Sequence, residues 1–257
     1  PLLKTGVETG VTKALQVDVT VDDMSLAILA GKLNMNNLVV NNPEGYKNPT
    51  FLELGHGFVD LNTKTLLSDT VEIDTVRLDN VKVTIEQKGL TSNLKEILNN
   101  LPEPKPSEEP PAEKKPGKNL LIKQLDIEGV QVTVKLLPVP GRADNLTLDL
   151  APIHMENIGS DEPIKTPQLI TKIILAIAGG IADKGKGILP TDMINSLGQQ
   201  LSEQGLKLLE SGQDIGTGIL EGGKKTGEEI IEGGKDIGKE ASEALKGLNP
   251  FRKKEDQ

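Results

Sequence analysis

The chain has 257 residues and a formal net charge of −9, and no local basic patch offsets this acidity, which argues against a nucleic-acid partner. The absence of cysteine excludes disulfides, thiolate metal sites and cysteine nucleophiles. Three Phe, one Tyr and no Trp leave Val, Ile and Leu to build the core, a composition that suits β-structure and also a surface that touches acyl chains.

The chain begins with a short helical pattern and then changes to a strand pattern. Residues 1–16 carry apolar side chains at three- and four-residue spacing, which predicts an N-terminal helix. From Val17 onward apolar and polar residues alternate, and this period of two continues to about residue 158. The alternation predicts a β-domain over residues 17–160.

An internal repeat lies within this β-domain. Four segments share the pattern apolar, any, apolar, polar, Asn or Gly, apolar, and their fifth residues are Asn37, Asn80, Gly129 and Asn157. Asn and Gly tolerate a positive φ, so we predict a β-bulge with positive φ at each position, which keeps the apolar side chains on one face. The alternative is a tight turn between two short strands. Both interpretations give an antiparallel sheet with one aliphatic face.

A proline-rich segment interrupts the β-domain at residues 102–118, where we predict a solvated, extended linker. Just before it, Ser92 and Glu96 flank the start of an apolar run with helical spacing. This arrangement predicts one short helix ahead of the linker.

After Pro167 the pattern becomes helical again, first over residues 167–198 and then in an eleven-residue repeat that predicts an amphipathic helix over residues 200–248. Each unit places Gly sixth, and an interior Gly costs about 1 kcal/mol of helix stability relative to Ala. We therefore predict that this stripe packs closely against a partner, although a marginal helix is the alternative. The candidate docking residues are Gly216, Ile219, Leu220, Gly227, Ile230, Ile231 and Gly238. Residues 249–257 form a charged tail.

The sequence offers no convincing catalytic or metal-binding motif. Neither His56 nor His154 has a neighbour at an interval that recommends a metal site. Two near-matches to the phosphate-binding loop begin at Gly180 and Gly218, but both lack the Ser or Thr that would hold the metal. We expect no enzymatic activity, no cofactor and no bound metal.

The segment 31–92 combines Asn42-Pro43-Glu44-Gly45-Tyr46 after a strand pattern with a repeat segment ending at Val81 and a closing Ser92-Asn93-Leu94. In this combination it resembles the N-terminal region of the AsmA family of bacterial envelope proteins, and the similarity covers about residues 1–160. The resemblance implies an N-terminal membrane anchor ahead of Pro1, a location at the periplasmic face of the inner membrane, an aliphatic β-groove and a role in lipid homeostasis. It supplies no catalytic residues, and the glycine-rich tail departs from the family pattern.

These patterns lead to an α+β fold and to two functional hypotheses. In the first, a non-catalytic envelope protein binds or handles lipid through its aliphatic face. The residues expected to contact lipid are Val76, Leu78, Val81, Val83, Ile85, Leu125, Ile127, Val130, Val132 and Val134. In the second, a scaffolding protein docks its glycine-rich helix onto its own sheet, a partner subunit or a membrane complex. The local charge of −4 over residues 200–248 argues against attraction of this helix to anionic lipids.

Overall fold

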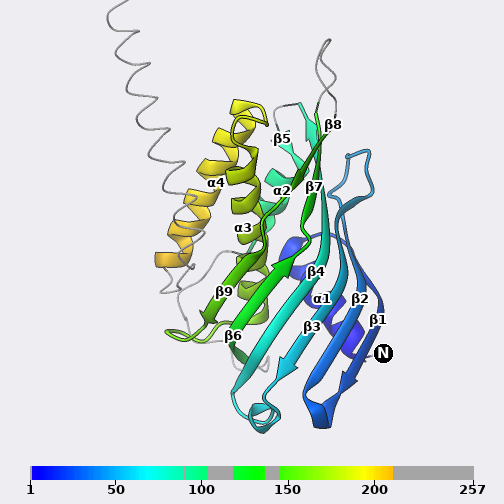
Figure 1. The fold of residues 1–257 in the computed structure, drawn as a ribbon, viewed down its shortest axis with the longest axis vertical. Coiled ribbons are helices and arrows are strands. Elements are labelled where there is room, and N and C mark those ends of the chain that lie inside the picture. Colours follow the sequence, from blue (N-terminus) through cyan, green and yellow to red (C-terminus); the bar gives the residue numbers. More distant parts are fainter. Residues whose placement is uncertain (1, 90, 103–117, 137–144, 211–257) are drawn as a thin grey trace, which may run out of the picture.

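The structure is a computed structural model, and it describes residues 2–89, 91–102, 118–136 and 145–210. Within them a nine-stranded sheet carries helices on one face (Figure 1). The strands are β1 (Val19–Ala27), β2 (Lys32–Asn41), β3 (Thr50–Leu61), β4 (Thr70–Lys88), β5 (Thr91–Ser92), β6 (Asn119–Glu128), β7 (Gln131–Lys135), β8 (Asn145–Asp149) and β9 (Ile153–Ile158). The helices are α1 (Leu2–Leu15), α2 (Asn93–Asn100), α3 (Thr166–Gly185) and α4 (Thr191–Glu210). The α+β class predicted from the sequence is confirmed.

The sheet is mostly antiparallel, in the order β1-β2-β3-β4-β6-β9, with β7 and β8 continuing beyond β6 and β9. The predicted antiparallel sheet is confirmed with one departure, because β4 pairs in parallel with both β6 and β7. Parallel neighbours need a long crossover connection, and the chain between β4 and β6 supplies one. This connection contains β5, α2 and the whole predicted proline-rich linker, of which residues 103–117 lie outside the described part.

The predicted positive φ is confirmed at all four repeat positions. Asn37, Asn80, Gly129 and Asn157 have φ values of 49°, 59°, 63° and 55°. Strands β2, β4 and β9 run on through their Asn, so the alternative of a tight turn is wrong at those three positions.

The break in alternation is shared across the sheet. The ladders that join β1, β2, β3 and β4 pass over one residue in each strand, and the ladder from β4 to β6 and β7 passes over two, with the same register on both sides. Five of these residues form a transverse row: Asp22, Asn37, Gly55, Asn80 and Gly129. A Cβ built on Gly55 would lie 3.0 Å from the Cβ of Asn80, so the strands approach closely here. Strands β1 to β4 and the β6–β7 segment therefore change phase together, and their aliphatic side chains stay on one face on either side of the row.

The helices confirm the sequence pattern in part. The N-terminal helix is α1, and the short helix before the linker is α2, whose first turn is capped by the side chain of Ser92 accepting from the backbone N–H of Lys95. The segment predicted as helical over 167–198 contains a break at residues 186–190, and the predicted boundary near residue 199 falls inside α4. The eleven-residue repeat is described only to Glu210, so all seven docking candidates lie outside the described residues.

Among the helices of the described segments, none combines the length and the apolar character needed to cross a lipid bilayer.

Candidate functional site

The ten side chains predicted on one face do share one face of the sheet. Nine of them are at most 5% exposed, and the tenth, Leu78, is half-buried against the same core. Such complete burial follows from alternation on β4, β6 and β7 together with the shared change of phase at the transverse row. The prediction of a single aliphatic face is confirmed.

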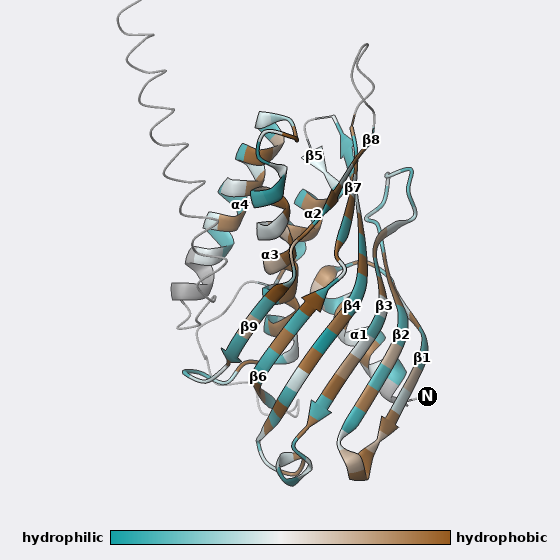
Figure 2. Ribbon diagram, viewed as in Figure 1, coloured by the Kyte–Doolittle hydropathy of each residue, from teal (hydrophilic) through white to brown (hydrophobic). Residues whose placement is uncertain are grey.

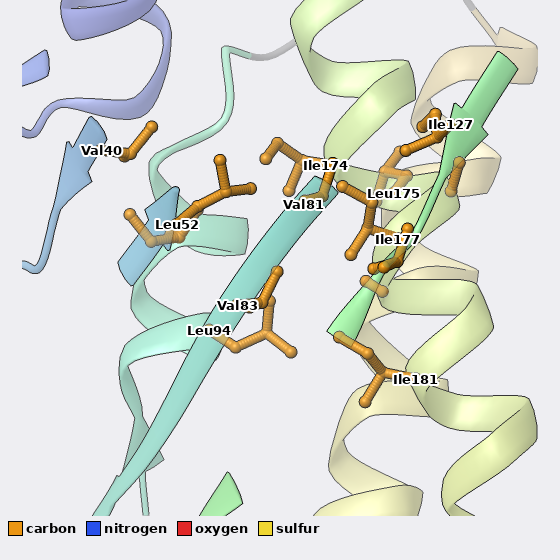
Figure 3. Packing of buried hydrophobic residues seen from close by; sticks show 14 of the residues in the cluster. Val40, Leu52, Val81, Val83, Leu94, Ile127, Ile174, Leu175, Ile177 and Ile181 are labelled. Atoms are coloured by element: carbon orange, nitrogen blue, oxygen red, sulfur yellow. The ribbon is translucent and has the colours of Figure 1, made fainter. Parts of the chain in front are cut away.

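Helices cover this part of the face. Figure 3 shows aliphatic side chains of α2 and α3, among them Leu94, Ile174 and Leu175, gathered against the side chains of β4 and β6. Ile181 of α3 and Leu94 of α2 are themselves buried, so the layer between helices and sheet is a closed core. Acyl chains would reach the ten candidates only if α3 moved away from the sheet.

The same face continues onto β1, β2 and β3, where Val21, Val40 and Leu54 on one side of the transverse row are buried. On the other side of the row its side chains are only partly buried. One ladder row crosses the sheet through Leu26, Leu33, Val59, Val76 and Leu125. Exposure falls along this row from 40% at Leu26, through half-buried Leu33 and Val59, to 5% at Val76 and 0% at Leu125. The aliphatic face therefore emerges from under the helices toward the β1 edge.

We name this uncovered part the open strip, and it consists of Met24, Leu26, Leu33, Met35, Val59 and Leu61. Met24 pairs with Met35, which in turn pairs with Gly57 on β3. A Cβ on Gly57 would lie 2.9 Å from the Cε of Met35, so the glycine leaves room for that side chain to lie across the strip. The sequence analysis did not select these residues, although Leu33 and Met35 occupy apolar places of the first repeat.

The loop that carries Asn42-Pro43-Glu44-Gly45-Tyr46 is fastened to α2 and to the end of β4. The hydroxyl of Tyr46 donates to Glu96 Oε1 at 2.7 Å, while Glu86 accepts from the backbone N–H groups of Lys47 and Asn48, both at 2.9 Å. Burial, helped by the carboxylate of Glu96, raises the pKa of Tyr46 far above its ordinary value, so its hydroxyl remains a donor. Burial alone would raise the pKa of Glu86, but the two backbone donors outweigh burial and hold that pKa below its ordinary value.

The fully buried side chain of Asn93 completes this attachment. Its Oδ1 accepts from the backbone N–H groups of Glu86 and Leu94 at 2.9 and 2.8 Å. Its Nδ2 donates to Asn42 Oδ1 and to the carbonyl of Thr84, both at 2.7 Å. All four bonds serve the fold, so the motif that carries the family resemblance has a structural role here.

Both histidines lie on the opposite, polar face of the sheet and contact carboxylates. His154 Nδ1 lies 2.5 Å from Asp126 Oδ1, and its Nε2 lies 3.1 Å from Glu156 Oε1. The hydrogen bond with Asp126, followed by that with Glu156, raises the pKa of His154. His56 Nδ1 lies 3.5 Å from Asp79 Oδ2. Sequence intervals missed both aspartate contacts because each partner comes from a neighbouring strand.

These pairs do not form a metal centre. In the segments that the structure describes, no three His, Cys, Asp or Glu side chains are grouped so as to hold an ion. A small cavity of about 140 Å³ lies at the other end of the sheet, lined among others by Ile85, Leu94, Ile181, Lys95 and Asp192. Sites for drug-sized ligands usually enclose about 300–1,000 Å³, so this cavity is too small for one.

Comparison with protein-family models, with curated proteins and with solved structures finds no match to this chain.

Proposed function

We propose that this protein binds lipid without catalysing a reaction, and that the acyl chain lies along the open strip. The observation that carries the proposal is the continuity of the strip with the buried core: a ladder row that is buried at Val76 and Leu125 becomes partly exposed on β1, β2 and β3. Contiguous apolar surface of this kind often marks a binding site in a soluble domain. The AsmA-like features of residues 31–92 favour the same function, at the periplasmic face of a membrane.

The energetics favour an aliphatic ligand on this strip. Covering an exposed Leu or Met side chain contributes about 1.5–3 kcal/mol when burial is complete, and each half-exposed side chain has part of that contribution still to gain. The strip side chains have no charge, so a polar ligand would lose hydration there without finding hydrogen bonds. A single acyl chain would gain this burial energy and has no polar groups along its length to leave unpaired.

The test uses charged substitutions on the strip and matched controls on the other face. We expect Met24→Asp and Leu33→Asp each to weaken binding of a fluorescent fatty acid by roughly tenfold or more, because the carboxylate would lose hydration against the acyl chain. Ser25→Asp and Asn34→Asp place the same charge one residue along, facing away from the strip, and should change the affinity by less than about twofold. Thermal unfolding of all four variants verifies that the fold is kept.

Native mass spectrometry of the parent and of Leu33→Asp, each extracted with its membrane, gives the second measurement. The parent should retain lipid and the variant should lose it. Equal retention by both proteins, or equal losses in strip and control variants, would overturn the proposal.

The scaffolding alternative is favoured by the contact between α4 and α2. At the start of the eleven-residue repeat, Gln200 Nε2 donates to Asn99 Oδ1 and Gln204 Nε2 donates to the carbonyl of Leu98, both at 3.2 Å. Gly205, the first sixth-place glycine, is buried. These contacts support docking of the repeat helix onto its own fold, and this alternative expects the strip variants to leave partner binding unchanged.

A further inference from the structure

Two neighbouring turns at one end of the sheet expose large hydrophobic side chains. Leu26, near the end of β1, is 40% exposed, Ile28 and Leu29 in the turn between β1 and β2 are 63% and 98% exposed, and Leu67 in the turn between β3 and β4 is 98% exposed. We name these four residues the tip. Of the described residues, only Ile188, in the α3–α4 connection at the opposite end, is a further large hydrophobic side chain with such exposure. Figure 2 shows the hydrophobic turn between β1 and β2.

The two turns are held to each other by the backbone. The N–H of Leu61 donates to the carbonyl of Gly31 at 2.7 Å, and a Cβ on Gly31, which has a φ of +68°, would lie 2.2 Å from the Leu61 carbonyl oxygen. Lys118 Nζ donates to the carbonyls of Leu66 and Ser68 at 2.6 and 2.8 Å, beside Leu67. These bonds hold the backbone of the two turns in place, and Leu29 and Leu67 project from it into solvent.

The small area of the tip and the lysines beside it favour a lipid bilayer over a protein as its partner. A stable protein interface usually buries about 800 Å² on each partner, which side chains that protrude singly from two turns do not offer. A bilayer accepts single aliphatic side chains below its headgroups. Exposed Lys32, Lys64 and Lys118 flank the tip, and long basic side chains beside apolar ones are favourable at the headgroup level.

We propose that the tip inserts into the surface of a lipid bilayer, with Leu29 and Leu67 as the penetrating side chains. This contact goes beyond acyl-chain binding on the open strip and does not depend on it. The strip begins at Leu26, which also belongs to the tip, so a docked molecule would direct the open end of the strip at the membrane.

The first experiment measures binding of the full chain to vesicles of phosphatidylcholine mixed equally with phosphatidylglycerol. We expect Leu29→Ser and Leu67→Ser each to lower the partition coefficient about tenfold, and the double variant to lower it about a hundredfold. Both side chains are almost fully exposed, so these variants should fold as the parent does. Ile188→Ser is the matched control and should leave the partition coefficient unchanged.

The second experiment places a single tryptophan in a chain that has none. Tryptophan fluorescence of Leu29→Trp should shift to shorter wavelength on addition of vesicles, whereas that of Ile188→Trp should not. This probe reports on the tip alone, whatever other parts of the chain contribute to binding.

An unshifted Leu29→Trp spectrum, or vesicle binding that survives the double serine variant, would overturn the proposal. Self-association of the parent that the double serine variant abolishes, without any vesicle binding, would assign the tip to a protein contact and overturn it equally. Failure of this proposal can be distinguished from failure of the acyl-chain proposal, because Leu33→Asp and Asn34→Asp should both keep the vesicle partition coefficient of the parent.

Discussion

A non-glycine residue in the left-handed region costs roughly 1–2 kcal/mol, and a β-branched side chain raises that cost further. Asn80, in the transverse row, holds this conformation with a φ of 59°. We expect Asn80→Val to lower the free energy of unfolding by about 2 kcal/mol, and Asn80→Gly to change it by less than about 1 kcal/mol. Urea unfolding followed by circular dichroism measures both.

Lys82→Val is the control for Asn80→Val, because Lys82 is an exposed strand residue on the same element. Valine suits an extended backbone, so this variant should be close to neutral. Comparable losses from the two valine substitutions would contradict the assignment of backbone strain to residue 80.

The positive φ at the four repeat positions was predictable because it depends on the local preferences of Asn and Gly and on the phase of nearby apolar residues. The bond from Asn93 to Asn42 was not predictable, because the two residues are 51 positions apart in the chain. The contact between His154 and Asp126 was missed for the same reason. At this scale, sequence reasoning succeeds where the cause lies within a few residues.

The element that tests the aliphatic face most directly is β7. Val132 is fully buried on the aliphatic face, while its neighbour Gln131 is exposed on the polar face. We expect Val132→Asp to lower the free energy of unfolding by at least about 4 kcal/mol, since the carboxylate would be buried without a partner. Gln131→Asp should change it by less than about 1 kcal/mol. Chemical denaturation gives both values, and equal tolerance of the two substitutions would contradict the assignment of faces.

The types of most strands and helices were predictable, because period-two and helical spacings are properties of each segment. The parallel pairing of β4 with β6 was not, since a long connection fixes neither the direction nor the neighbour of the next strand. The division of the aliphatic face into a covered part and an open strip was also beyond the sequence. It depends on where α3 packs, and α3 follows the sheet in the chain.

At the scale of the whole molecule, a cross-link between helices can test whether lipid binding on the open strip requires the helical layer to move. The chain contains no cysteine, so Asn99→Cys with Gln200→Cys provides one defined pair between α2 and α4, whose native side chains are 3.2 Å apart. We expect a short bismaleimide bridge at this pair to leave fatty-acid affinity unchanged within about twofold, because the open strip is accessible with the helices in place.

The unbridged double cysteine variant is the control, and gel mobility reports the extent of reaction. A clear loss of affinity in the bridged protein would show that the helical layer has to open before lipid binds. The covered part of the face, including Val81 and Val83, would then belong to the binding site.

The transverse row from Asp22 to Gly129 has a consequence for how the chain can change its length. It divides the sheet into two panels, since β1 to β4 and the β6–β7 segment change phase there without any shift in register. A one-residue insertion or deletion inside either panel would turn the inward side chains of that strand outward from that point on. The same change in the turns at residues 28–31 or 62–69 would leave both panels intact. If the tip contacts a membrane as proposed, the chain can therefore gain, lose or exchange residues at that contact while its core stays the same.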